Sequence, residues 1–402
     1  MKRSGFFAVI LSLGLSTCHL LVSAQLPGVT LTDSAKVSLI TCSQGNELYS
    51  IFGHSAIRVN DPAIGIDWVF NYGTFDFSDP KFYPNFIKGK LNYILSVSNY
   101  EHFEYTYIYE NRFIYEQQIN LTPQEKQQLL DSLSINYLPQ NRYYLYDFLF
   151  DNCATRIRNI FAEAVPRTIV FNDSMYGESM SFRDLLMPFV VEKPWAKLGI
   201  NLLLGVKADR IATPWEYMFL PDYMMEAFQY ASFQTDTTLY PVAKEKVTLL
   251  VGKKLPRNSF RNSPLFVFMA VFLIAAGLTI WGVRKRKYSR WFDALLFGLV
   301  GLLGVVLAFQ WFGSDHVVMS NNYNLLWAHP LHLIAAIVLL FKNSAGFLKY
   351  YFLINMALLL LLMLCWFLLP QTLPFPLFPM VASMAIRSAV VYKRAKRIVR
   401  KE

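Results

Sequence analysis

The chain has 402 residues and a formal net charge of +10, and it is 54% hydrophobic but only 16% charged. This is too apolar for a single soluble domain, and the excess of apolar residues lies after residue 263, which indicates a membrane. The positive charge does not indicate a nucleic-acid-binding protein. It lies in two clusters beside apolar runs, at 284–290 and 393–401, and no groove pattern of aromatic and basic residues accompanies them.

The N-terminus has the pattern of a secretory signal peptide. Three residues that include Lys2 and Arg3 precede an apolar run, and small residues end at Ala24, where we expect cleavage. Residues 15–18 resemble a lipoprotein box, but threonine is a poor residue before the lipidated cysteine. The mature chain would therefore begin near Gln25, outside the cytoplasm.

Cysteine usage leaves two thiols to explain. Cys18 would be removed with the signal peptide, and Cys365 lies in an apolar run. Cys42 and Cys153 would remain in an oxidising compartment, where a disulfide between them is one interpretation.

Three strands are predicted near the start of the mature chain, at 37–42, from His54 onward and at 67–72. A hairpin centred between residues 62 and 63 sets Asn71 opposite His54 and Asp67 opposite Arg58. Because side chains alternate along a strand, all four would share one face. Asn71 would then orient the imidazole, although a slip of one residue would turn it away.

Residues 73–120 are rich in Tyr and Phe and are predicted to form further strands and loops. They contain His102, a competing candidate for a base. Thr122, Pro123 and Glu125 form a capping pattern, so a helix should follow to about residue 133.

A second helix is predicted at 152–164, with Cys153 at its start. The N-terminus of a helix favours anions and drives a thiol towards the reactive thiolate. With His54 as base, Cys153 could attack an acyl carbonyl and form a thioester. Its backbone N–H, with a side-chain donor such as Asn152, would stabilise the oxyanion. Ser55 is a poor nucleophile here, because its side chain and that of His54 point to opposite faces of the strand.

The region 166–262 is predicted as helical segments broken by prolines, including an apolar stretch at 198–206 that is too short to span a bilayer. Five apolar runs follow, at 264–282, 291–312, 325–341, 349–369 and 375–392. Five spans place both basic clusters inside. Arg387 would then extend to the inner interface.

Polar residues lie in and beside the second external loop, namely Asp315, His316, Asn324 and His329. Ionisable residues in or near a span suggest function, but capping, turn formation and anchoring at the interface are an alternative. The spacing of Asp315, His316 and His329 fits no standard metal site.

Four segments resemble a known family: residues 52–58 (FGHSAIR), 71–77 (NYGTFDF), 150–156 (FDNCATR) and 218–221 (MFLP). They look like the periplasmic domain of the Lnb-type lipoprotein N-acyltransferases, which is similar to circularly permuted NlpC-type cysteine peptidases and to lecithin:retinol acyltransferase-like enzymes. The membrane part resembles the extension of Bacteroidetes members.

This resemblance implies an α+β fold, with a circularly permuted papain/NlpC-like domain followed by an all-α transmembrane bundle. The expected domains are a signal peptide at 1–24, a catalytic core at 25–165, a helical extension at 166–262, five transmembrane helices at 263–392 and a basic cytoplasmic tail at 393–402. The inner membrane of a bacterium, with the catalytic domain in the periplasm, is the expected location.

The implied reaction moves a fatty acyl chain to the α-amine of a lipoprotein's N-terminal cysteine, without a cofactor. In the Lnb-type reaction the donor is the lipoprotein's own diacylglyceryl group, while a phospholipid donor stays open. Carried over by position, Cys153 would be the nucleophile and His54 the base. Asn71 is the third member chosen from the predicted register, with Asp67 in reserve.

Two rival interpretations remain. The first is a membrane-tethered cysteine peptidase or amidase that acts on cell-envelope peptides. The second is a non-catalytic envelope protein in which Cys42 and Cys153 form a disulfide.

Overall fold

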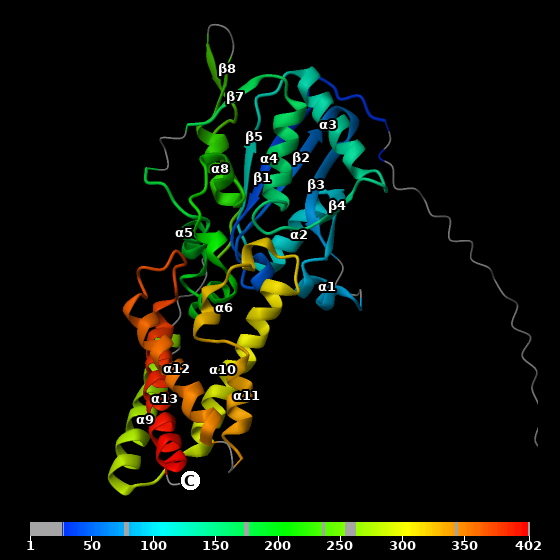
Figure 1. The fold of residues 1–402 in the computed structure, drawn as a ribbon. Coiled ribbons are helices and arrows are strands. Elements are labelled where there is room, and N and C mark those ends of the chain that lie inside the picture. The colour runs from blue at the N-terminus through cyan, green and yellow to red at the C-terminus, as the bar shows by residue number, and fades with distance from the viewer. Residues whose placement is uncertain are drawn as a thin grey trace, which may run out of the picture.

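The computed structural model describes residues 26, 28–75, 80–172, 177–234, 238–253, 263–341 and 345–400. The predicted signal peptide, with Cys18, lies outside these residues. Figure 1 shows an α+β domain joined to a bundle of long helices. This is the fold class that the sequence predicts.

The centre of the α+β domain is a seven-stranded antiparallel sheet with the order β10-β5-β1-β2-β3-β4-β6. One face packs against α3 (Pro123–Tyr137) and α4 (Cys153–Ala164), and the other against α2 (Tyr100–Glu110). The strands are β1 (Lys36–Cys42), β2 (His54–Asp61), β3 (Ile66–Thr74), β4 (Asn92–Asn99), β5 (Ile114–Gln118), β6 (Tyr143–Leu145) and β10 (Val247–Leu250).

The hairpin of β2 and β3 has a different register from the predicted one. Ile57 lies opposite Phe70, so the strands are shifted by two residues from the pairing that set His54 against Asn71. The turn extends to Gly65, which closes it in the left-handed region at φ 68°. An even shift keeps every side chain on its predicted face. His54 and Asn71 therefore become diagonal neighbours, which long side chains still bridge.

The aromatic region at 73–120 contains two helices that were predicted as strands or loops, α1 (Phe82–Lys88) and α2. Tyr100, Phe103 and Tyr107 are buried on one side of α2, with the spacing of a helix face. Aromatic residues also favour strands, which explains the wrong assignment. His102 lies on the exposed side of α2.

The segment predicted as a helical extension is only partly helical. It holds α5 (Phe182–Leu186), α6 (Pro194–Leu203), α7 (Pro214–Tyr217) and α8 (Pro221–Tyr230). It also forms a second sheet from β7 (Thr168–Val170), β8 (Ser232–Gln234) and β9 (Leu239–Pro241). Its last strand, β10, pairs with β5 and completes the main sheet.

Within the described residues, four helices are long and apolar enough to cross a membrane. They are α9 (Pro264–Lys285), α10 (Arg290–Phe312), α12 (Ala345–Leu364) and the segment Phe375–Val399, which contains α13 (Phe378–Val399). The third predicted span is instead a broken segment. Its helix α11 (Leu331–Val338) has 8 residues, about 12 Å at 1.5 Å per residue.

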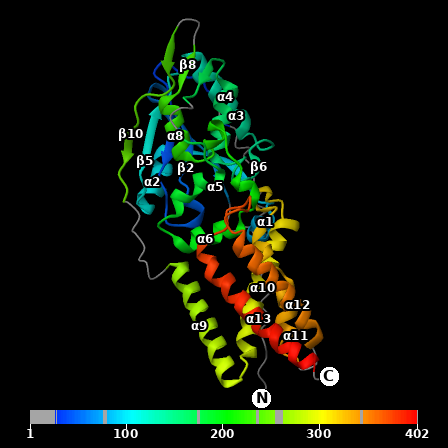
Figure 2. The same ribbon diagram turned by 60° about the vertical axis from the view of Figure 1, so that its left-hand side comes forward.

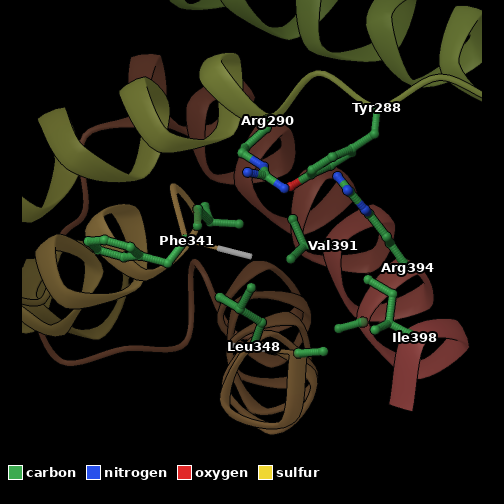
Figure 3. A pocket seen from close by; sticks show the side chains of 10 residues that line it. Tyr288, Arg290, Phe341, Leu348, Val391, Arg394 and Ile398 are labelled. Carbon is green, nitrogen blue, oxygen red and sulfur yellow. The ribbon is translucent and has the colours of Figure 1, made fainter. Parts of the chain in front are cut away.

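The broken segment nevertheless runs from one end of the bundle to the other. Asn324 contacts the end of α6, whereas Phe341 lines a small hollow of about 30 Å³ with Tyr288 and Arg394 at the opposite end. Figure 3 shows these side chains, with Arg394 against the Tyr288 ring at 3.9 Å. The described part of the chain thus passes along the bundle five times, and the third pass is not a continuous helix.

Arg387 does not extend to the inner interface as predicted. Its side chain is 1% exposed and forms a two-point ion pair with the buried Asp293 of α10, at 2.5 and 2.9 Å. It also donates to Thr279 Oγ1 of α9 at 3.0 Å. A buried charge requires such partners, and this one ties three helices together.

The two domains meet at the end of α6. Asn322 Nδ2 donates to the carbonyl of Leu202 at 2.6 Å, and Gln371 Nε2 donates to that of Leu204 at 3.0 Å. Gly205 follows, and its N–H donates to Val318 at 2.9 Å. A Cβ on Gly205 would lie 1.9 Å from the Ser320 carbonyl oxygen, so only glycine permits this approach.

We therefore predict that Gly205→Ala loosens the contact between the domains. Overpacking of this kind costs about 1–3 kcal/mol. Thermal unfolding of the detergent-solubilised protein should show a lower midpoint. Gly199→Ala is the matched control, because a Cβ there would meet nothing within 4 Å and alanine favours a helix. Equal midpoints for the two variants would contradict this account of the interface.

Candidate active site

The start of α4 is fixed by a reciprocal cap. Asn152 Oδ1 accepts from the Thr155 N–H at 3.0 Å, and Thr155 Oγ1 accepts from the Asn152 N–H at 2.8 Å. Cys153 is consequently the first residue of the helix, as predicted. Its thiol lies beside backbone N–H groups that have no partner within the helix.

Asn152 supports this position but has no donor left for an oxyanion. Its amide donates to the carbonyls of Phe148 at 2.8 Å and Phe219 at 2.9 Å, and the residue is 4% exposed. The predicted donation from this side chain is therefore wrong. The backbone N–H groups of Ser55, Ala154 and Cys153 face the sulfur instead, and they lower its pKa.

His54 and Asn71 are brought together as predicted, although the register differs. The His54 Nε2 and Asn71 Oδ1 atoms are 2.6 Å apart. Because the amide oxygen only accepts, Nε2 carries the proton, and Nδ1 keeps the lone pair that a general base needs.

The thiol and the imidazole flank one small space beside Gly73. The pairing of β3 with β4 is irregular between Asn71 and Thr74, and Gly73 has a φ of 92°. A Cβ on Gly73 would lie 3.6 Å from Cys153 Cβ and 3.8 Å from His54 Cε1. Among the described residues no hydrogen bond joins the thiol to the imidazole. Such contacts often tighten only when substrate binds.

Tyr144, which the sequence analysis did not select, points its hydroxyl towards the same space. Its oxygen lies 3.9 Å from the Gly73 Cβ position. This hydroxyl is buried and, among the described residues, has no hydrogen-bond partner. A buried donor without a partner is costly, and a ligand oxygen would satisfy it.

Burial dominates the electrostatics of the site. It raises the pKa of the Cys153 thiol, even though three backbone N–H groups and Arg112 lower it. Burial also lowers the pKa of His54 from 6.5 to about 4, although the hydrogen bond that His54 donates to Asn71 raises it. The prediction that the helix start drives this thiol to thiolate is wrong for the resting site, where both groups are neutral at neutral pH.

Arg112 is a second residue that the sequence analysis missed. Its guanidinium is 5% exposed, donates to Ser43 O at 2.7 Å and pairs with Glu110 at 2.8 Å. Its charge lowers the pKa of both Cys153 and His54. It therefore favours a thiolate beside a neutral imidazole.

Arg58 and Asp67 form an ion pair on the same face of the hairpin, four residues from His54 and from Asn71 respectively. Arg58 Nε and Nη2 each lie 2.7 Å from an Asp67 oxygen, and the guanidinium covers the Tyr100 ring at 3.7 Å. Asp67 is therefore committed to Arg58, and Asn71 is the neighbour of His54. Ser55 is fully buried, and its hydroxyl has no partner in the described part of the chain.

The predicted alternative of a Cys42–Cys153 disulfide is not present, since both are free thiols. Cys42 is fully buried opposite His54 in the neighbouring strand. Burial raises its pKa to about 12, so it remains an inert thiol.

The polar residues of the external loop lie apart from this site and hold elements together. The Asp315 N–H donates to the Lys88 carbonyl at 2.9 Å, and His316 Nε2 lies 2.8 Å from the Phe86 carbonyl oxygen. Asn324 accepts from the Trp327 indole at 3.1 Å. The ring centroids of His329 and His332 lie 3.9 Å apart, so these two imidazoles stack. No group of three possible metal ligands occurs among the described residues.

These loop contacts show which way the site faces. The strand β3 ends beside Gly73, and the chain continues into α1, whose last turn touches Asp315 and His316. Figures 1 and 2 both place α1 at the end of the α+β domain next to the bundle. Cys153 and His54 therefore lie at the end of the sheet that faces the apolar helices.

We predict that Tyr144→Phe slows acylation of Cys153 by a p-nitrophenyl ester by about 10²–10³-fold, the usual cost of one lost oxyanion donor. Tyr143→Phe is the matched control, because Tyr143 is 55% exposed on the same strand. Release of p-nitrophenol measures the rate. Equal rates for the two variants would exclude a role for the Tyr144 hydroxyl.

Because Cys153 and His54 are both neutral at neutral pH, we also predict how the reactivity of the thiol depends on pH. Alkylation of Cys153 by iodoacetamide, measured by peptide mass spectrometry, should rise steadily into the alkaline range. The acid limit of acyl transfer, where His54 gains a proton, should lie near pH 4 and not near 6.5. Arg112→Gln should slow alkylation, and Arg112→Lys should retain most of it. A rate plateau from mildly acidic to alkaline pH would show a preformed ion pair instead.

Two family models match the chain. The Lnb N-terminal periplasmic domain matches residues 30–185, which include His54, Asn71 and Cys153, and the Lnb transmembrane domain matches residues 256–397. No curated protein and no solved structure matches the chain. With a periplasmic domain that carries the thiol site and a transmembrane domain behind it, the chain belongs to the Lnb family.

Proposed function

We propose that this protein is a membrane-anchored thiol acyltransferase that moves a fatty acyl chain to the N-terminal cysteine amine of bacterial lipoproteins. The observation that carries the proposal is the joint placement of Cys153, His54 and Asn71 at the end of the sheet that faces the transmembrane bundle. A thiol with a base and an orienting amide suits covalent acyl transfer.

The surroundings of the site favour a lipid substrate. A row of aromatic rings leads from the site towards the bundle, with Phe75 5.3 Å from Tyr93 and 5.6 Å from Phe82. It continues through Phe86 to His316 of the external loop, 6.4 Å away. On α1, Tyr83, Phe86 and Ile87 are 66%, 49% and 46% exposed. Such a surface suits acyl chains better than a cell-wall peptide.

The first half-reaction would form a thioester. His54 Nδ1 takes the thiol proton as the Cys153 sulfur attacks the ester carbonyl of a diacylglyceryl group, on the lipoprotein itself or on a phospholipid. Backbone N–H groups at the start of α4 and the Tyr144 hydroxyl would stabilise the oxyanion. The ester C–O bond breaks, and the departing alkoxide takes the proton from His54.

The second half-reaction would release the acyl chain to the acceptor. The α-amine of the lipoprotein's N-terminal cysteine attacks the thioester carbonyl and gives a proton to His54. The C–S bond then breaks, and the thiolate recovers that proton. The products are an N-acyl amide and a lyso lipid, and the enzyme returns to its starting state.

The same scheme places the bundle in the inner membrane and the α+β domain in the periplasm. Tyr288, Arg290 and Arg394 gather at the end of the bundle opposite that domain (Figure 3). Basic residues of this kind stay on the cytoplasmic side.

Mass spectrometry of lipoprotein N-termini from a deletion strain tests the proposal. The N-acyl group should be absent, and a plasmid copy should restore it. Cys153→Ser should fail to restore it, and His54→Ala should lower the rate in proteoliposomes by about 10²–10⁴-fold, the usual contribution of a general base. His102→Ala is the matched control, because His102 lies on the exposed side of α2.

Unchanged N-acylation in the deletion strain would exclude the acyltransferase. Altered muropeptides with intact lipoproteins would instead identify a cysteine peptidase or amidase.

A further inference from the structure

A cavity of about 530 Å³ lies at the junction of the two domains, away from Cys153. Its walls come from α5 and α6 of the α+β domain, from the start of α9 and from the segment between α12 and α13. Figure 1 shows α6 at this junction. The volume is within the range of small-molecule sites.

The cavity opens at the level of the membrane surface. Pro264 begins α9, and residues 366–376 connect α12 to α13, so both walls are outer ends of helices in the bundle. The neighbouring Phe367 and Phe375 are 79% and 53% exposed, as expected for side chains in contact with lipid. The lining around them is mostly apolar, with Leu198, Leu369 and Leu373.

One positive charge in the wall lacks a partner. Arg183 is neutralised by Asp209, with two contacts of 2.9 Å. Asp184 is held by the Ser181 hydroxyl at 2.6 Å. Lys197 is half-buried in the wall, and none of the ion pairs within the described residues includes its ammonium. A cation beside an apolar cavity favours an anionic group on an apolar ligand.

Trp366 supplies a second unpaired donor in the same wall. The residue is 2% exposed, and in the described part of the chain its indole N–H has no hydrogen-bond partner. A buried indole N–H usually has an acceptor. A ligand oxygen here would remove the free-energy cost of leaving this donor without one.

We propose that this cavity binds one glycerophospholipid from the outer leaflet of the membrane. Its phosphate lies at Lys197, its ester oxygens lie near the Trp366 indole, and an acyl chain follows the apolar wall to Phe375. The lipid fills the space between α6 and the bundle and fixes the orientation of the thiol domain over the membrane. This site is separate from the acyl-transfer site and does not depend on its chemistry.

Native mass spectrometry of the full chain, purified in a mild detergent, tests the proposal. The Cys153→Ser background removes any thioester, so a retained lipid is non-covalent. One phospholipid should remain bound. Lys197→Gln should weaken retention of added phosphatidylglycerol by about 10- to 100-fold, the cost of one charge-assisted contact. Lys207→Gln is the control, because Lys207 is exposed in the short helical turn Val206–Asp209 after α6 and does not line the cavity.

Each outcome decides the matter. Loss of the lipid in Lys197→Gln alone, with unchanged unfolding in lipid-free detergent, supports the site, and Trp366→Phe should then weaken retention as well. Equal retention in all variants would show lipid around the helices only, and absence of lipid in every variant would exclude the site. Displacement by inorganic phosphate would show an anion site and exclude the phospholipid.

Discussion

The position of the Cys153 sulfur depends on how one helix begins. Asn152 caps α4, and the same amide anchors the loop before the helix to the carbonyl of Phe219, 67 residues further on. One buried side chain thus joins the cysteine helix to the segment before α8. Caps of this kind are worth about 1 kcal/mol in stability. Here the cap also selects which backbone N–H groups surround the thiol.

The opposite wall of the site depends on the sheet. His54 is the first residue of β2, and Asn71 lies near the end of β3, so the pair occupies a place where regular pairing stops. The irregularity at Gly73 leaves room for groups from three elements, namely the imidazole, the thiol and the Tyr144 hydroxyl. Burial then keeps the thiol and the imidazole neutral until a substrate arrives. This limits side reactions of a thiol in an oxidising compartment.

Sequence patterns predicted the parts of the site that follow from periodicity. The alternation of side chains placed His54 with Asn71 and Arg58 with Asp67, and these pairs survive a two-residue error because the error is even. The helix start at Cys153 was also predicted, and the reciprocal cap of Asn152 and Thr155 in the structure explains it. The resemblance of four short segments to one family supplied the expected fold class and the expected roles of Cys153 and His54.

Other features depend on contacts that no local pattern contains. Tyr144 lies on a three-residue strand at the edge of the sheet, and only the folded chain brings it to Cys153. Arg112 acts through its charge, which lowers the pKa of the Cys153 thiol, whereas burial of the thiol raises that pKa against the expectation. Arg387 finds its partner Asp293 94 residues away, and the third membrane pass is broken within an apolar run.

The edge strand β10 affects how a fragment of the α+β domain would behave without the rest of the chain. It pairs with β5, and α9 begins 14 residues after its last residue. The matched periplasmic region ends at residue 185, well before this strand. A fragment cut at that point would lack β10, so β5 would keep β1 on one side and have an unpaired edge on the other. Exposed edges of this kind join to other chains. The last strand before the membrane thus covers the edge of the main sheet that β5 would otherwise expose.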